Sequence, residues 1–309
     1  MRVFSLYVLT VFCFSGVCSS AFSESLVITH DMQYEYASLL LDEKDYETAL
    51  VEFKRFVHFF PESAQKQTAQ FKIGQCLFYT GKYHEAAQIF NQIILADTDP
   101  ALVSQSVFFQ SRAFMHQNNP GYAQVVLHNY LKLTRDTAIK DQIYFNLAMI
   151  QISEARKGKS EALDQALEYL EKISPENMPS YAADTRIDMV KKAKQIPQKN
   201  PTLAGVLSII PGGGFAYCGR YKDAAVTFLL NVGLMVAAFQ AWENDNEALA
   251  GVIGFVETGF YSANIYGGVS SAHKYNRAQV IRILNQEVHI QPKIDPEKKG
   301  ASLTLNFPF

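Results

Sequence analysis

The sequence predicts a mainly α protein: a stack of paired helices, then an apolar helical hairpin of membrane-domain type, then a short carboxyl-terminal β-hairpin. Apolar residues recur at three- and four-residue steps between about residues 33 and 189, which is the period of an α-helix. Two later apolar runs, 224–242 and 248–272, reach the length of roughly 20 residues that a helix needs to cross a hydrocarbon core. The predicted segments are a signal peptide over 1–21, helical repeats over 22–197, a membrane-like helical domain over 198–286 and a tail over 287–309.

The first residues have the pattern of a secretory signal. Arg2 precedes an apolar centre over 8–17, and the small residues 19–21 form a cleavage site that would leave Phe22 as the mature start. An uncleaved anchor helix is the alternative, although the apolar centre is short for a span. Lipid attachment at Cys18 is disfavoured, because the residues before it lack the leucine-then-small pattern of a lipoprotein box. We therefore expect an exported protein.

Composition and cysteine usage exclude several classes of function. A net charge of -2 without a basic stripe gives no nucleic-acid surface. Removal of the signal leaves Cys76 and Cys218 in different domains, so we expect no disulfide between them. The seven histidines are scattered singly, and no nucleophile and base are paired in the sequence. We expect no metal, no cofactor and no enzymatic activity.

A short motif recurs in the first part of the repeat region. The segment 44–49, followed by Phe53 and Pro61, is echoed by 81–86, followed by Phe90. In each copy a turn precedes a tyrosine that caps the groove between two helices, and an alanine stands where the backbones approach closely. The predicted packing residues are Tyr46, Ala49, Phe53, Gly74, Tyr83, Ala86 and Phe90. The pattern resembles the tetratricopeptide repeat, and the first unit is similar to periplasmic tetratricopeptide proteins of the barrel-assembly and cell-division-coordinator kind.

Two weaker units follow over 108–133 and 143–173, and one further helix over 181–195. In the unit over 108–133 the alanine is expected to be displaced. Four stacked units form a right-handed solenoid with a concave surface, which the resemblance implies is for binding a protein or peptide partner. The alternative is that the array serves only as a spacer.

The proline-punctuated linker 195–201 precedes a glycine-rich stretch. The motif residues are Pro211, Gly212, Gly214, Tyr217, Gly219 and Arg220. This string resembles a motif of small bacterial helical-hairpin membrane domains, in which a glycine-rich turn leads into a long apolar helix. Such domains often carry glutamine where this chain has Phe215, which argues against a polar role for the turn. A phosphate-binding loop is excluded, because no preceding strand and no following Lys-Ser or Lys-Thr pair is present.

The two long runs carry polar residues that must be accommodated. Gly259, Ala263, Gly267 and Ser271 recur every four residues and predict a close helix contact. Glu257, Tyr261 and Asn264 form a polar ridge on roughly the opposite side. A carboxylate is costly inside a bilayer, so we expect Glu257 to face protein or water, and our hypothesis is that it pairs with Asn231, Gln240 or a tyrosine hydroxyl. Its role is either to fix hairpin register or to serve an ion or substrate.

Charge placement gives conflicting topology signals. The loop 243–247 is acidic, whereas Arg220, Lys222, Lys274, Arg277 and Arg282 flank the apolar runs, which puts the loop outside under the positive-inside rule. The signal puts the repeats outside as well. Both hold only if 203–217 also crosses, or if the hairpin packs compactly on the repeats without crossing.

The sequence thus favours a non-enzymatic adaptor of the bacterial cell envelope, anchored in the inner membrane with periplasmic repeats. The alternative is a membrane domain that assists protein insertion or transport while the repeats recruit clients. The oligomeric state is left open.

Overall fold

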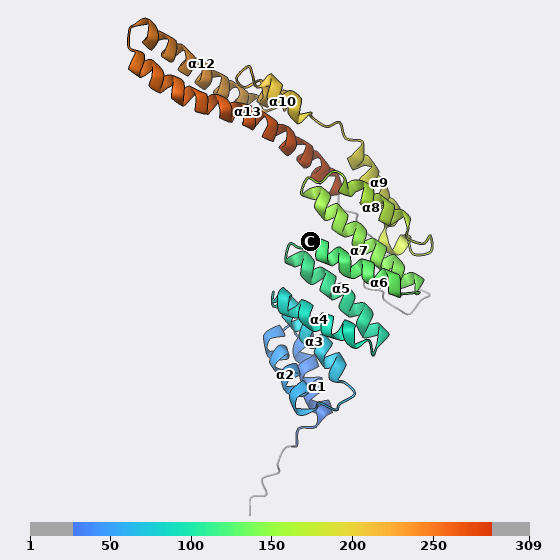
Figure 1. The fold of residues 1–309 in the computed structure, drawn as a ribbon. Coiled ribbons are helices and arrows are strands. Elements are labelled where there is room, and N and C mark those ends of the chain that lie inside the picture. Colours follow the sequence, from blue (N-terminus) through green and yellow to red (C-terminus); the bar gives the residue numbers. More distant parts are fainter. Residues whose placement is uncertain (1–26, 286–309) are drawn as a thin grey trace, which may run out of the picture.

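The computed structural model describes residues 27–285, and all regular structure within that range is helical. Helix pairs stack into a curved array, and a long hairpin projects from the end of the array (Figure 1). The repeat helices are α1 His30–Asp42, α2 Tyr46–Phe59, α3 Lys66–Tyr79, α4 Tyr83–Ala96, α5 Pro100–His116, α6 Pro120–Leu133, α7 Thr137–Arg156, α8 Ala162–Glu171, the 3-10 turn η1 Pro179–Tyr181 and α9 Ala183–Lys194. The hairpin part comprises α10 Pro201–Leu207, α11 Gly213–Tyr217, α12 Tyr221–Glu243 and α13 Glu247–Leu284.

The turns inside the first three helix pairs share one backbone device. Lys44, Gly81 and Asn118 are spaced 37 residues apart, and each has a positive φ, of 65°, 79° and 55°. A residue in this left-handed conformation ends a helix and reverses the chain within a few residues. The three pairs therefore repeat in register.

The same period carries a buried alanine through the array. Ala49, Ala86 and Ala123 are each fully buried at equivalent places in the second helix of their pair. The expectation of a displaced alanine in the third unit is wrong, because Ala123 lies 37 residues after Ala86. The helices of the third pair approach each other at the same level as those of the first two.

Helix starts are fixed by acidic caps. The Asp99 carboxylate accepts a hydrogen bond from the Ala101 backbone nitrogen at 2.8 Å, and Asp136 does the same for Ala138 at 2.8 Å. Pro100 occupies the first turn of α5, where its missing N–H leaves no bond unmade. These residues separate successive helix pairs.

The apolar core runs the length of the array and continues into the hairpin. One cluster joins α1 to α5, a second joins α5 to α7, and a third is built on α7, α8 and α9. Val280 and Leu284, from the last turns of α13, belong to this third cluster. The hairpin is therefore fastened to the repeats by one end of one helix.

Two predicted segments lie outside the described residues, namely the signal peptide over 1–21 and the β-hairpin in the tail over 287–309. Within 27–285 no strand is present. Cys76 and Cys218 are both buried and unpaired, so the expected absence of a disulfide between them is confirmed.

Candidate functional site in the hairpin domain

The predicted packing residues of the first two repeats lie in the solenoid core. Ala49, Phe53, Ala86 and Phe90 are fully buried. The rings of the two motif tyrosines stack on neighbouring aromatics: Tyr46 on Tyr79 with centroids 4.7 Å apart, and Tyr83 on His116 at 4.6 Å. A methyl group at Gly74 would come within 2.6 Å of the Phe90 ring. These residues shape the scaffold and form no chemical site.

The glycine-rich turn is a packing device between α10, α11 and α13. Gly212 has φ of 81°, and a side chain there would meet the Ala224 carbonyl. A Cβ atom on Gly214 would lie 2.9 Å from the Gly268 Cα atom and would also meet the Ser208 hydroxyl. Only glycine permits these approaches. The turn, with Pro211 between α10 and α11, thus lets two short helices lie directly on α13.

The Asn264 side chain binds backbone groups of this turn. The Gly212 amide donates a hydrogen bond to Asn264 Oδ1 at 2.9 Å, and Asn264 Nδ2 donates to the Ser208 carbonyl at 2.6 Å. One turn of helix earlier, the Tyr261 hydroxyl donates to the Ile209 carbonyl at 2.9 Å. The polar ridge of α13 therefore satisfies backbone groups that the broken helix leaves without intrahelical partners.

The remaining motif residues fasten the turn to its surroundings. The Asn200 amide donates to the Tyr217 hydroxyl at 3.1 Å, which ties α11 to the start of α10. Gly219 has φ of 78° and reverses the chain before α12. Arg220 lies with its guanidinium 5.2 Å from the Phe215 ring centroid, and it donates to the Ser271 hydroxyl at 2.8 Å. Phe215 therefore makes a cation–π contact with Arg220.

The hairpin has an apolar exterior. Among the described residues, α12 alone has the length and mean hydropathy, 1.8, of a membrane span, and only 6% of that apolar window is buried. The predicted second span in α13 does not reach this hydropathy. Its exposed face is nevertheless apolar. The large exposed apolar side chains of α12 and α13 are Tyr221, Val226, Phe228, Leu229, Leu230, Met235, Val236, Phe239, Trp242, Leu249, Val252, Phe255, Val256, Phe260 and Tyr266.

Polar residues lie inside the hairpin. Asn231 is 1% exposed and Glu257 is 8% exposed. Counted from Asp245 in the connecting turn, they lie 14 residues before and 12 after, so they sit within about 3 Å of the same axial level. The expected pairing of Glu257 is wrong: neither carboxylate oxygen has a hydrogen-bond partner in the described structure, and Asn231 Oδ1 has none either.

The expected small-residue stripe is correct only at its carboxyl-terminal end. Gly267 packs against the Phe215 ring and Ser271 bonds to Arg220, whereas Gly259 has no atom near its Cβ direction and Ala263 is exposed. The close contact is made by Gly268, which faces Ser208 and Gly214. The packed face of α13 is thus the polar one, and the hairpin turns its apolar side chains outward.

Charges divide between the two ends of the hairpin. Glu243, Asp245 and Glu247 lie at the tip. The other charged side chains of α12 and of α13 up to residue 272 are Lys222, Asp223 and Glu257. The opposite end, which we call the base, carries Arg220, Lys222, Lys274 and Arg277. Exposed aromatic residues mark both ends, with Trp242 at the tip and Tyr221 and Tyr266 at the base.

Polar contacts reinforce the attachment of the base to the repeats. Asn276 pairs with the backbone of Lys199, accepting from its nitrogen at 2.7 Å and donating to its carbonyl at 2.9 Å. Arg277 Nε donates to the Arg156 carbonyl at 2.9 Å, and Arg156 donates to the Leu284 carbonyl at 2.9 Å. The hairpin and the repeats thereby form one continuous body.

Several residues of this arrangement escape sequence reasoning. Ser208, Gly268, Asn276 and Arg156 act on backbone groups or small residues far away in sequence, so no local pattern points to them. The adjacent glycines Gly267 and Gly268 are the one available signal, since either could have faced the neighbouring helix.

Residues 68–96, which span most of α3 and all of α4, match the tetratricopeptide repeat family. Among solved structures, the chain is similar to a crystal structure of a TPR repeats protein from Bacteroides fragilis, with 14% sequence identity and a TM-score of 0.36, over 84% of this chain and 98% of that chain. None of the curated proteins compared matches the chain. The repeat match and the stacked helix pairs make the amino-terminal part a tetratricopeptide-like solenoid, a class of fold that serves as a scaffold for protein interactions.

Proposed function

We propose that the protein is a non-enzymatic adaptor of the bacterial cell envelope. Its repeats bind a protein partner in the periplasm, and the hairpin of α12 and α13 anchors them in the inner membrane. The anchoring is carried by one observation: the apolar window of α12 is almost entirely exposed, whereas the core helix of a soluble protein would bury it.

The dimensions of the hairpin suit a bilayer. A helix of 23 residues is about 35 Å long, slightly more than the roughly 30 Å of a hydrocarbon core. Trp242 and Tyr221 lie near the two ends of α12, where interfacial aromatic residues are common. Glu257 and Asn231 face the inside of the hairpin, so the lipid-facing surface carries no charge at this level.

The attachment of the base to the repeats also supports one orientation of the hairpin in the membrane. The carboxyl-terminal end of α13 lies against the repeats, and α12 begins beside α10, at the end of the hairpin opposite the acidic tip (Figure 1). An inserted hairpin therefore keeps the repeats and the base on one side and sends the acidic tip to the other. With periplasmic repeats, this arrangement puts the acidic tip in the cytoplasm and the basic base in the periplasm, which is opposite to the positive-inside expectation from the sequence. α10 and α11 lie against α13 at the base, and the hairpin does not fold back onto the repeats.

Partner binding is supported by exposed apolar side chains at the open end of the array. Met32, Tyr36 and Leu39 recur at helical spacing on α1 and are each about half exposed. Because no preceding helix pair covers this face among the described residues, it is available to a partner segment.

A second candidate function is transport or protein insertion by the hairpin itself. The buried and unpartnered oxygens of Glu257 favour it, since an intramembrane carboxylate often marks an ion or substrate path. Replacing Glu257 with glutamine separates the two. An adaptor keeps its activity in cells if the variant folds, whereas a transporter loses it.

Location and topology are tested with the full-length tagged chain in cells. Carbonate washing should leave the protein in the membrane fraction. The native cysteines of the described residues are buried, so single cysteines introduced by Lys82→Cys in the repeats and Asp245→Cys at the tip report sidedness. An impermeant maleimide added to spheroplasts should label the first and spare the second. Extraction by carbonate, or the reverse labelling pattern, contradicts the proposal.

The partner is tested by crosslinking in cells followed by purification of the full chain. Tyr36→Asp should remove a specific crosslinked protein, and the neighbouring exposed change Glu35→Gln should retain it. Loss of the same protein from both variants, or from neither, contradicts a docking role for α1.

A further inference from the structure

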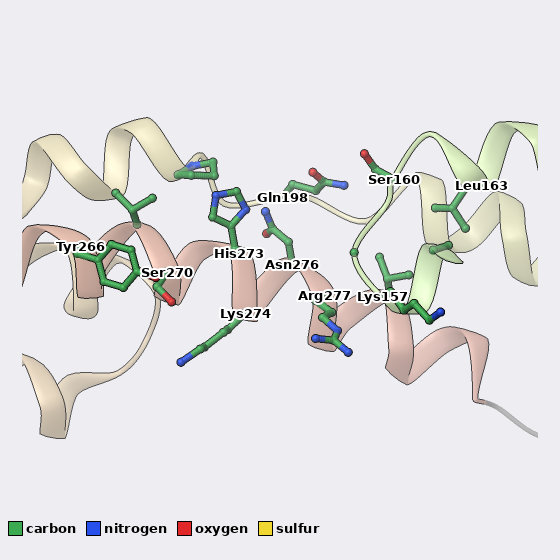
Figure 2. A pocket seen from close by; sticks show the side chains of 15 residues that line it. Lys157, Ser160, Leu163, Gln198, Tyr266, Ser270, His273, Lys274, Asn276 and Arg277 are labelled. Atoms are coloured by element: carbon green, nitrogen blue, oxygen red, sulfur yellow. The ribbon is translucent and has the colours of Figure 1, made fainter. Parts of the chain in front are cut away.

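A cleft lies at the base, between the repeats and α13 (Figure 2). Its volume is about 650 Å³, and its lining comes from the turn between α7 and α8, from the linker before α10 and from one face of α13. Figure 2 shows Gln198 of the linker above α13, between His273 and Ser160, with Lys157 beside Arg277. None of the glycine-rich motif residues and none of the predicted packing residues of the repeats line this cleft.

The cleft is basic. Lys157, His273, Lys274 and Arg277 line it, and none of the described residues lining it is acidic. Glu154, below the turn, is already bound by Lys157 at 2.9 Å and by Lys159 at 2.5 Å. Those two lysines lower the pKa of the Glu154 carboxyl even though burial alone would raise it. The Glu154 carboxylate is therefore ionised and already paired with these two lysines.

Two of the cleft cations have no acidic partner in the described structure. Lys274 makes no ion pair there, and Arg277 uses Nε for the Arg156 carbonyl, which leaves its terminal nitrogens without a described acceptor. Ser160 and Ser270 add hydroxyl donors to the lining. Lys274 and Arg277 lie about one helical turn apart on the α13 side of the cleft, and an ammonium and a guanidinium are groups that suit a phosphate.

The position of the cleft selects the source of that phosphate. By helical register, the start of α12 at Tyr221 lies level with residue 269 of α13. Lys274 and Arg277 then lie about 8 to 12 Å beyond the end of the apolar span. Lipid headgroups occupy a layer of several ångströms just outside the hydrocarbon core. The backbone of these two residues therefore lies at the outer edge of the headgroup layer when the hairpin is inserted. Long lysine and arginine side chains can reach back from there to the headgroups.

We infer that this cleft binds the headgroup phosphate of an anionic phospholipid. The bound lipid would join the repeat turn to α13 at the membrane surface and so set the angle at which the solenoid leaves the bilayer. This inference rests on the proposed insertion of the hairpin, but the binding site itself can be tested without a bilayer.

Binding is measured on the full chain in neutral detergent, with short-chain phosphatidylglycerol, short-chain phosphatidylcholine and inorganic phosphate as separate probes. The wild type should bind phosphatidylglycerol in preference to the other two. The double change Lys274→Gln with Arg277→Gln should weaken this binding at least about tenfold, the effect of losing one charge-assisted contact. Lys222→Gln, which removes a basic residue at the base outside the cleft, should leave it unchanged.

Arg277 also donates a hydrogen bond to the Arg156 carbonyl, so its loss could disturb the fold. Two milder variants, Lys274→Gln alone and Arg277→Lys, should retain the fold, and thermal unfolding checks that they do. The first should weaken lipid binding, and the second should retain most of it. Unchanged binding in a folded double variant overturns the inference, as does equal binding of phosphatidylcholine or of inorganic phosphate. Failure of carbonate resistance with intact phosphatidylglycerol binding would instead overturn the anchoring proposal and leave the site standing.

Discussion

Asn264 and Gly212, 52 residues apart in sequence, are joined side chain to backbone: the Gly212 amide donates to Asn264 Oδ1 at 2.9 Å. The same asparagine donates through Nδ2 to the Ser208 carbonyl at 2.6 Å, and both contacts are buried. A single amide thus closes the gap in hydrogen bonding between α10 and α11. The turn motif and the polar ridge of α13 are two halves of one structural unit.

Replacing Asn264 with alanine should destabilise this unit. The change leaves the Gly212 amide and the Ser208 carbonyl buried without partners, at a cost of about 1 to 3 kcal/mol for each group. Denaturant unfolding of the full chain in detergent measures the loss. Ser262→Ala on the exposed side of α13 is the matched control, and a loss of equal size in the control would contradict the role given to Asn264.

Gly74→Ala should destabilise the repeats by overpacking. The added methyl group would lie 2.6 Å from the fully buried Phe90 ring, and strain of this kind typically amounts to about 1 to 3 kcal/mol. Gly121→Ala, at the start of α6 with no atom within 4 Å of the new methyl, should be neutral or slightly stabilising. Thermal unfolding compares the two variants. Equal melting temperatures would show that the Phe90 contact is looser than described.

Asp141 should make stability depend on acid pH. Burial alone would raise the pKa of its carboxyl, but hydrogen bonds from Asn177 and Ser174 outweigh burial and lower it. A carboxyl with a lowered folded pKa contributes stability above its unfolded pKa of about 4, and this contribution is lost as the pH falls through the folded value. Wild-type stability should therefore decline on acidification below about pH 4.

Asp141→Asn should flatten that decline and reduce stability at neutral pH, because the new amide nitrogen opposes Asn177 Nδ2, which now donates at 2.7 Å. Asp188→Asn on the exposed side of α9 is the control and should leave the pH profile unchanged. Chemical unfolding at a series of pH values gives the comparison. A profile of Asp141→Asn identical to the wild type would contradict the assignment.

Cys76 should be unreactive in the folded protein. It is fully buried, and burial raises the pKa of its thiol to about 12, so almost no thiolate forms at neutral pH. Maleimide labelling followed by mass spectrometry should modify it only after unfolding. Rapid labelling under native conditions would show that the second helix pair opens readily.

The sequence allowed the repeats to be predicted well, because their signals are local. Ala49, Phe53 and their equivalents recur at a fixed spacing of 37 residues, so spacing alone places them, and Tyr46 and Tyr83 stack on rings of the next helix pair. Ala123 was assigned the wrong register because its unit keeps the alanine but lacks the preceding motif. In helix-pair arrays the period of the left-handed turn residues is the surer guide.

The hairpin was harder to predict, because the face of α13 that packs inward is determined by backbone groups far away in the sequence. Asn264 was predicted to lie on a polar ridge, opposite the small-residue stripe that was expected to pack. Its partners are the Ser208 carbonyl and the Gly212 amide, which are backbone groups and give no side-chain signal. The expected pairing of Glu257 followed from the cost of burying a charge, and the structure instead leaves its oxygens without hydrogen bonds. The packed face of α13 can be assigned only when the positions of α10 and α11 are known.

Insertion of the hairpin is tested most directly by the fluorescence of Trp242, the one tryptophan in the chain. The full-length protein is reconstituted into vesicles, and quenching by brominated lipids is compared with quenching by aqueous iodide added outside. Insertion predicts blue-shifted emission, quenching by lipids brominated near the headgroup, and protection from external iodide when the repeats face outward. Red-shifted emission that iodide quenches and brominated lipids do not would contradict a membrane-embedded hairpin.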